Sequence, residues 1–143
     1  MYLLDTNVVA ELRRPRPNAS VLRWLRSIPE AELFLSAATI GELEAGIEGL
    51  REQDEAKAEP LTRWLDLLAA THNVLPMDQD AFWLWAKLLH RKPQPASEDA
   101  MIAATALLHD LTVVTRNTRA FAAFDVPLLD PFLAEPRSPL TGA

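Results

Sequence analysis

The chain of 143 residues is long enough for one domain with a sizeable hydrophobic core, and its 49% hydrophobic content excludes an intrinsically disordered protein. Its net charge of −6, from 14 basic and 20 acidic residues, argues against a protein that coats duplex nucleic acid and leaves open an enzyme that contacts a short stretch of RNA. The absence of cysteine excludes disulfide bonds and thiolate metal sites, and without a membrane-length apolar stretch or signal-peptide pattern the chain is expected to be soluble and cytoplasmic.

The first half of the chain alternates short apolar runs with helical patterns. Residues 2–4 predict a buried strand, and the helix expected from Thr6 to Leu12 ends before Pro15. Apolar periodicity then predicts four more elements. They are a helix over residues 18–27, a strand over 33–35, a helix from Ser36 to about Glu48 that ends near Gly49, and a helical region over 52–70 in which Pro60 is a candidate break.

The second half repeats this alternation. Val74 and Leu75 predict a strand, and Asp78 caps a helix whose Trp83 and Trp85 are expected to face the core or a subunit interface. Ser97 opens an alanine-rich helix over residues 98–109 that should lie buried against a sheet. Further strands are expected at 112–114 and, more weakly, 126–129, so that residues 1–133 form one domain before a loose tail over 134–143.

This order of elements predicts an α/β fold. Each strand is short and wholly apolar, which is typical of strands in a parallel sheet that is covered on both faces. Strands also alternate with helices along the chain. We therefore expect a three-layer α/β/α sandwich around a central, mostly parallel sheet of four or five short strands.

Four polar residues that are far apart in the sequence are expected to meet at one end of this sheet. Ligands of an open parallel sheet bind beyond the carboxyl ends of its strands. Asp5 and Asn117 follow the first and fourth predicted strands, and Glu42 lies about two turns into the helix after the second strand. Asp99 begins a helix that runs antiparallel to the strands, so it is expected at the same end.

Three carboxylates in one cleft predict a bound cation. Two unit charges about 4 Å apart repel by roughly 4 kcal/mol at an effective dielectric constant near 20. Oxygen ligands alone favour Mg²⁺ or Mn²⁺, and the three histidines show no spacing that would favour zinc. A hard cation of this kind suits phosphoryl transfer, because it activates water and offsets charge on the leaving oxygen.

Each of these residues also has a purely structural explanation. Asp5 can cap the helix that begins at Thr6, and Glu42 completes a capping-box pattern with Thr39. Asp99 lies in a first helical turn, where an acid interacts favourably with the helix dipole, and Asn117 suits a turn. Their expected convergence at one end of one sheet is what favours a site.

The residues around these positions resemble those of PIN-domain proteins, specifically VapC-type toxins of bacterial toxin–antitoxin pairs. The resemblance runs from residue 1 to about residue 133 and rests on five segments that occur in the family's order. They are Leu3-Leu4-Asp5-Thr6-Asn7-Val8, the segment 35–43 from Leu35 to Leu43, the segment 99–106 from Asp99 to Ala106, Val113-Val114-Thr115-Arg116-Asn117, and Leu128-Leu129-Asp130-Pro131-Phe132.

The resemblance implies an endoribonuclease that depends on Mg²⁺ or Mn²⁺, forms a homodimer and is inhibited by a cognate VapB-type antitoxin. It assigns the acidic cluster to Asp5, Glu42 and Asp99, and the fourth position to Asn117. Relatives with asparagine at that position often carry an aspartate three residues later, where this chain has Ala120. The missing fourth acid leaves a second hypothesis open, namely a catalytically impaired module that only binds RNA or a partner.

In the mechanism expected from these residues, Asp5, Asp99 and Glu42 bind the metal ion, and the polar groups around them support the metal site. Asn7, Thr6 and Thr115 are the supporting residues, and Arg116 and Arg13 are expected to contact the phosphates of an RNA substrate, with transfer RNA one candidate. A receiver domain needs an acidic pair after the first strand, and a haloacid-dehalogenase-like phosphatase needs Asp-x-Asp. Asp5-Thr6-Asn7 meets neither requirement.

Overall fold

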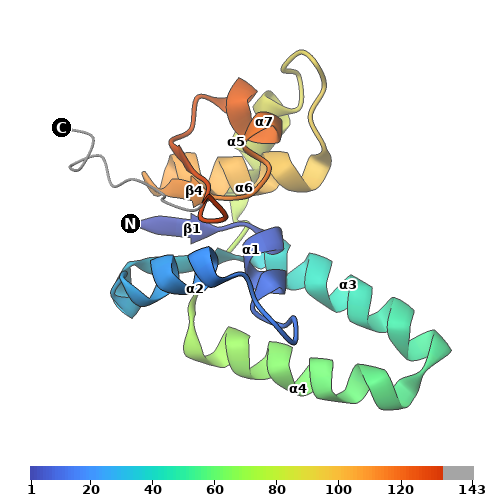
Figure 1. Cartoon of the computed structure of the whole chain (residues 1–143). Helices are drawn as coiled ribbons and strands as arrows, with labels where there is room; N and C mark the ends of the chain where they lie inside the picture. Colours follow the sequence, from blue (N-terminus) through green and yellow to red (C-terminus); the bar gives the residue numbers. More distant parts are fainter. Residues whose placement is uncertain (134–143) are drawn as a thin grey trace.

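A five-stranded, entirely parallel sheet runs through the centre of the computed structural model, which describes residues 1–133 (Figure 1). The strand order across the sheet is β3-β2-β1-β4-β5. The strands are β1 (Tyr2–Leu4), β2 (Leu33–Ser36), β3 (Asn73–Leu75), β4 (Thr112–Val114) and β5 (Leu128–Leu129). The predicted three-layer fold is confirmed, and the sheet is parallel throughout.

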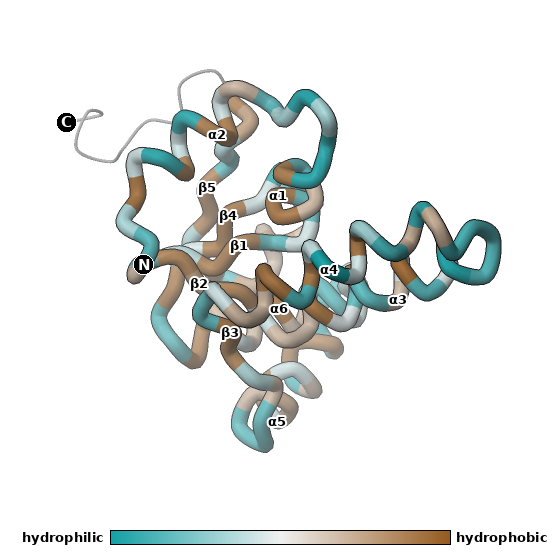
Figure 2. The backbone as a smooth tube through the Cα atoms, turned by 90° about the horizontal axis from the view of Figure 1, so that it is seen from below, coloured by the Kyte–Doolittle hydropathy of each residue, from teal (hydrophilic) through white to brown (hydrophobic). Residues whose placement is uncertain are grey.

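Both faces of the sheet are buried, which explains why most strand positions are apolar, with the polar Ser36, Asn73 and Thr112 at strand ends. On the central strand β1, Leu3 packs into one hydrophobic core and Leu4 into a second core on the opposite face. Val113 and Val114 of β4 divide in the same way, because successive side chains of a strand point to opposite faces. Figure 2 shows these brown, apolar strands enclosed by the helices.

Two groups of helices cover the sheet. One core packs under α5 and α6 with the short segments α7 and η2, and the other packs under α1 to α4. No helix within residues 1–133 is both long and apolar enough to cross a membrane. The bounds are α1 Thr6–Glu11, α2 Ala19–Arg26, η1 Glu30–Glu32, α3 Ala37–Gln53, α4 Glu55–Thr71, α5 Gln79–Leu88, α6 Ser97–Leu108, α7 Thr118–Phe121 and η2 Ala122–Phe124.

Side-chain caps define most helix starts, as predicted. Ser36 accepts a hydrogen bond from the backbone N–H of Ala38 and begins α3, and Asp78 caps α5 through the N–H of Ala81. The predicted cap at Ser97 is wrong, because α6 begins one residue earlier than expected. Ala96 occupies the cap position without a side-chain hydrogen bond.

The predicted breaks at Gly49 and Pro60 are also wrong. Helix α3 continues through Gly49 to Gln53, and α4 runs through Pro60 without interruption. The break falls instead at Asp54, which ends α3 and caps α4 through the N–H of Lys57. Packing between two long antiparallel helices outweighs the weaker intrinsic preferences of single residues. The strand expected over residues 126–129 shortens to β5, and the predicted tail over 134–143 lies outside the described residues.

The two tryptophans of α5 have different environments. Trp85 is half-buried, and its indole Nε1 donates a hydrogen bond to the carbonyl oxygen of Ser97 at the start of α6. Its ring also lies edge-to-face with Phe82. Trp83, by contrast, is 66% exposed. The core assignment is therefore confirmed for Trp85, and a subunit interface at Trp83 stays a prediction.

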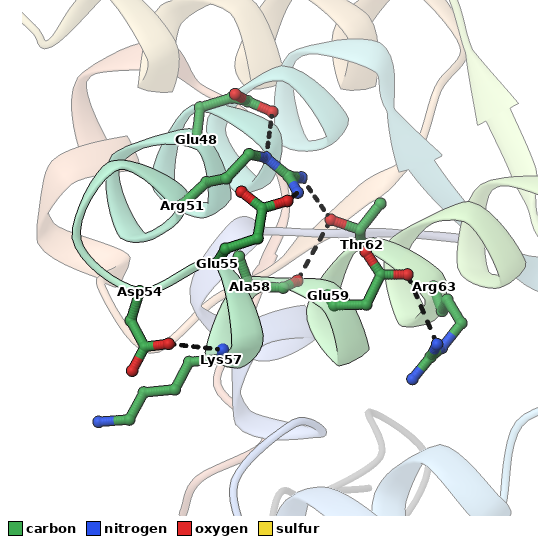
Figure 3. A network of polar contacts seen from close by, with 9 residues as sticks. All are labelled: Glu48, Arg51, Asp54, Glu55, Lys57, Ala58, Glu59, Thr62 and Arg63. Atoms are coloured by element: carbon green, nitrogen blue, oxygen red, sulfur yellow. Dashed lines mark hydrogen bonds and ion pairs between the residues drawn. The ribbon is translucent and has the colours of Figure 1, made fainter.

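The α3–α4 pair projects beyond the sheet (Figures 1 and 2) and is held by a polar network around Arg51 (Figure 3). The guanidinium of Arg51 lies 3.2 Å from Glu48 and 3.3 Å from Glu55, and it donates a 2.6 Å hydrogen bond to the hydroxyl of Thr62 on α4. Its side chain is only 24% exposed. Arg51 therefore joins the two helices through a charge-assisted contact that is partly shielded from water.

Replacement of Arg51 by methionine should lower the urea midpoint of unfolding, since Thr62 loses its donor and Glu48 and Glu55 lose their cation. The matched control is Arg63→Met, because Arg63 is 69% exposed and, within residues 1–133, pairs only with Glu59 of the same helix. We expect that control to change stability by less than about 0.5 kcal/mol. Urea denaturation measures both, and equal effects would contradict the assigned role of Arg51.

Candidate active site

The connections of the sheet create a crevice beyond the carboxyl ends of β1 and β4. From β1 the chain moves outward to β2 and β3, and it then returns to the other side of β1 to form β4 and β5. The two neighbouring strands β1 and β4 are thus followed by segments that leave in opposite directions. Such a switch in strand order is where open α/β sheets bind their ligands.

Asp5 and Thr115 meet at this crevice. Each residue follows its strand directly, and the Thr115 hydroxyl donates a 2.7 Å hydrogen bond to Oδ2 of Asp5. The other carboxylate oxygen of Asp5 accepts a 2.7 Å hydrogen bond from the backbone N–H of Thr6. Asp5 therefore caps α1, as its structural explanation required, and also presents a carboxylate at the site. Only 5% of Asp5 is exposed.

Asn7 ties the two strand ends together. Its amide nitrogen Nδ2 donates to Oδ2 of Asp5 at 3.2 Å and to the hydroxyl of Thr115 at 3.3 Å. Its amide oxygen Oδ1 accepts a 3.2 Å hydrogen bond from the backbone N–H of Arg116. The side chain is thus fixed at both ends, and it holds the loop after β4 against the start of α1.

Thr6 links the first strand to α3. Its hydroxyl donates a 2.8 Å hydrogen bond to Oε1 of Glu42, and it also lies 3.0 Å from the hydroxyl of Thr39. Thr39 is fully buried one turn before Glu42 on α3. Thr6 therefore connects the two acids that were expected to converge. Its backbone N–H donates to Asp5, and its hydroxyl donates to Glu42.

Asp99 and Glu98 approach the same crevice from the first turn of α6. Burial raises the pKa of the Asp99 carboxyl above its ordinary value, and the nearby charges of Asp5 and Glu98 raise it further. Sequence reasoning did not assign Glu98 to the site. The sequence places Glu98 directly before Asp99, but acids are common in first helical turns, so this position alone does not indicate a functional residue.

The other two carboxyls are shifted in the same direction. Burial raises the pKa of Asp5, although its hydrogen bonds from Thr115 and Thr6 lower it in part. Burial also raises the pKa of Glu42, opposed by the Thr6 hydroxyl and reinforced by the charges of Asp5, Glu98 and Asp99. The ionised form of each acid is thus disfavoured by its surroundings.

No Lys, Arg or His within residues 1–133 forms an ion pair with Asp5, Glu42 or Asp99. The acids influence one another electrostatically, yet in this part of the chain no three Asp, Glu or His side chains are drawn together closely enough to form a ready-made cation site. The crevice is therefore an uncompensated negative region whose oxygen donors suit a hard cation.

Two of the predicted residues lie at the rim of this crevice. The backbone N–H of Asn117 donates a 2.9 Å hydrogen bond to the Thr115 hydroxyl, while the exposed side chain of Asn117 makes no hydrogen bond within residues 1–133. The guanidinium of Arg116 lies 4.1 Å from the centre of the Phe132 ring, a cation–π contact. Phe132 was missed by sequence reasoning, since a contact between side chains of two loops leaves no periodic pattern.

Arg13 lies in a different environment. It lines a cavity of about 320 Å³ between the end of α1 and the two long helices α3 and α4. The same cavity is lined by Leu43, Gly46 and Trp64, so its floor is mainly apolar. The structure brings Asp5, Thr6, Asn7, Glu42, Asp99 and Thr115 to one crevice, and it places Arg13 in this neighbouring groove.

Comparisons with known proteins agree with this architecture. The PIN domain family model matches residues 2–127. The chain is 38% identical to Toxin FitB of Neisseria gonorrhoeae over 139 residues, which are 92% of this chain and 99% of that one. It is 32% identical to VapC ribonuclease Y4jK of Sinorhizobium fredii, with 92% and 98% of the two chains covered.

A solved toxin–antitoxin complex from Klebsiella pneumoniae has the same fold. It superposes with a TM-score of 0.69 at 28% identity and covers 92% of this chain and 98% of the matched one. The family match spans most of the described residues and includes the segments that carry Asp5, Glu42, Asp99 and Thr115. The chain therefore belongs to the PIN-domain family, among its VapC-type proteins.

Proposed function

We propose that this protein is a metal-dependent endoribonuclease and the toxin of a toxin–antitoxin pair. The observation that supports the chemistry is the acidic crevice, in which burial and, to a lesser extent, the charge of Asp5 raise the pKa values of Glu42 and Asp99. No basic residue of the described chain forms an ion pair with these acids. Relatives named as ribonucleases and toxins support the substrate class and the biological role.

The donor set fits a divalent cation. Asp5, Glu42 and Asp99 offer carboxylate oxygens only, which favours Mg²⁺ or Mn²⁺ over zinc. These three residues would hold the ion, which when bound supplies activation of water and neutralisation of charge at the phosphate. The cation would also offset the cost of burying the three carboxylates and the repulsion that further raises the pKa values of Glu42 and Asp99.

The surrounding residues position these acids. Thr115 and Asn7 hold Oδ2 of Asp5, so the carboxylate keeps one orientation beyond the end of β1. Thr6 fixes one oxygen of Glu42, which leaves its second oxygen free to accept a proton from water.

Arg116 would receive the RNA at the rim. Its guanidinium rests on Phe132 rather than on a carboxylate, so its hydrogen-bond donors are available to a phosphate. The backbone of Arg116 is anchored by Asn7, which also touches Asp5. The phosphate-binding residue is thus connected to the acidic crevice through one side chain.

The groove beside Arg13 would bind a VapB-type antitoxin, and the solved structure from Klebsiella is likewise a complex of a toxin with an antitoxin. Its apolar lining from α1, α3 and α4 suits the apolar face of a helix, and Arg13 and Arg14 at its edge suit an acidic segment. An antitoxin bound in this groove would also lie close to Glu42, because the next residue of α3, Leu43, lines the groove. The homodimer expected from the resemblance stays a proposal, with the exposed Trp83 as a candidate contact.

The impaired-module hypothesis retains one observation in its favour. Neither Asn117 nor Ala120 supplies a fourth carboxylate, and the side chain of Asn117 does not touch the acids. Glu98 adds negative charge near the same crevice and weakens that argument. An assay of RNA cleavage separates the two hypotheses directly.

Purified protein should cleave RNA in Mg²⁺ or Mn²⁺ and lose this activity in chelator. Asp99→Asn should lower the cleavage rate by about 100-fold to 1,000-fold, because a charge that stabilises the reacting groups is removed. The control is Asp66→Asn, which changes an exposed acid on α4. A panel of total and transfer RNA analysed on gels measures both, and near-wild-type cleavage by Asp99→Asn would rule out the assigned site.

Asp99→Asn should also stabilise the metal-free protein at neutral pH. The pKa of Asp99 is raised from 3.8 on folding, so folding is penalised increasingly as the pH rises above 3.8 and the penalty is complete above the folded-state pKa. The variant lacks this penalty. We expect its Tm in chelator to exceed that of the wild type at pH 7, and the difference to shrink as the pH falls and to vanish below the ordinary carboxyl pKa of 3.8.

Thermal unfolding followed by circular dichroism across pH 3.5–8 measures that difference. Addition of Mg²⁺ should reverse the order, since it stabilises the wild type more than the variant. A difference that does not change with pH would show that Asp99 is not destabilised by its surroundings.

Gly46→Phe should weaken antitoxin binding without unfolding the protein. A Cβ atom added at Gly46 meets nothing within 4 Å, and Gly46 lines the groove, so the larger side chain is expected to occupy the groove. Gly49→Phe is the matched control, because it lies one turn further along α3 with equal space and outside that lining. Affinity for a co-expressed VapB-type antitoxin should fall more than about tenfold for the first variant only, which corresponds to 1.4 kcal/mol.

A further inference from the structure

A second cavity opens directly beside the acidic crevice. It has a volume of about 390 Å³ and lies between the loop that precedes α6 and the α7–η2 segment. Asp99 lines it, so the cavity and the acidic crevice share one residue. Its size falls within the range of pockets that hold small organic ligands.

Most of the side chains that line this cavity are short and apolar. Pro93 and Ala96 form part of one side, and Ala120 and Ala123 form part of the other. Walls without long side chains leave room for a flat ring. The two sides are also tied together, because Arg91 donates a 3.3 Å hydrogen bond to the carbonyl oxygen of Ala123.

Two polar side chains accompany these apolar walls. Gln94 contributes an amide with both donor and acceptor groups, and Arg119 contributes a guanidinium. Within residues 1–133, Arg119 forms neither an ion pair nor a side-chain hydrogen bond. An unpaired guanidinium beside an apolar slot suits a ligand that is flat, polar at its edge and negatively charged at one end.

We propose that this cavity binds the nucleotide next to the scissile phosphate of single-stranded RNA. The base enters between the Pro93 and Ala120 walls, Gln94 contacts the base edge, and Arg119 contacts the phosphate. Bases of single-stranded RNA present an apolar face and a hydrogen-bonding edge, which matches this combination of walls and amide. The assignment rests on the proposed function, because the shared residue Asp99 is what places this nucleotide beside the cleavage point.

The test uses nucleoside 5′-monophosphates, which contain no phosphodiester bond and therefore bind without being cleaved. AMP, GMP, CMP and UMP are each titrated into ¹⁵N-labelled protein with Mg²⁺ present. Saturable chemical-shift changes should appear at the backbone amides of Gln94, residues 96–99 and residues 119–123. Arg119→Gln should weaken binding at least tenfold, and Ala120→Leu should abolish it by filling the cavity.

Arg63→Gln is the control, because it removes an exposed arginine on α4 that is remote in the fold from this cavity. Gln94→Ala should reduce the preference among the four bases more than the affinity itself. Shift changes elsewhere, or unchanged binding in both Arg119→Gln and Ala120→Leu, would overturn the proposal.

The two proposals can fail separately. Cleavage of RNA without nucleotide binding in the cavity would overturn the nucleotide site alone. Binding in the cavity without metal-dependent cleavage of any RNA would support a nucleotide-binding cavity, and it would overturn both the nuclease function and the place of this nucleotide beside a cleavage point.

Discussion

The hydrogen bond from Thr115 to Asp5 holds the functional end of the sheet together. It joins the two strands between which the order of the sheet reverses, and both residues occupy the first position after their strands. Asn7 adds a second connection between the same strand ends. Thr6 then extends the connection to Glu42 on α3. Three consecutive residues after β1 therefore position an acid, bind the loop after β4 and orient a second acid from another layer.

The three acids place unfavourable electrostatic interactions at the proposed catalytic site. Burial raises the pKa values of Asp5, Glu42 and Asp99, and repulsion from neighbouring acids raises those of Glu42 and Asp99 further. No Lys, Arg or His of the described chain forms an ion pair with these acids. The rest of the molecule has ordinary sources of stability, namely two apolar cores on opposite faces of the sheet and helix caps at most helix starts. The fold tolerates the acidic crevice because these cores lie outside it, and stability is lowered at the place where a charged ligand can restore it.

Much of this fold could be predicted from the sequence, because short apolar strands alternate with helices and the burial of a parallel sheet leaves that pattern in each strand. The convergence of Asp5, Glu42 and Asp99 on one edge followed from the same topology. Other features depended on contacts between distant segments. Helix α3 passes through Gly49 because it packs on α4, Arg13 lies in a groove that exists only once α1, α3 and α4 assemble, and Phe132 contacts Arg116 across two loops. Glu98 was overlooked because an acid in a first helical turn has a sufficient local explanation.

The pairing of β1 with β4 has a consequence for how the protein becomes active. The contact between Asp5 and Thr115 spans 110 positions of the chain, whereas β1 pairs with β2 over a much shorter separation. Closing so long a loop is entropically costly and slow relative to local helix formation. During synthesis, the α1–α4 half can form its own contacts while Asp5 still lacks its threonine. Contact order therefore favours late completion of the acidic crevice, and a ribosome-bound chain that ends before β4 already contains every residue that lines the groove beside Arg13 but still lacks Thr115.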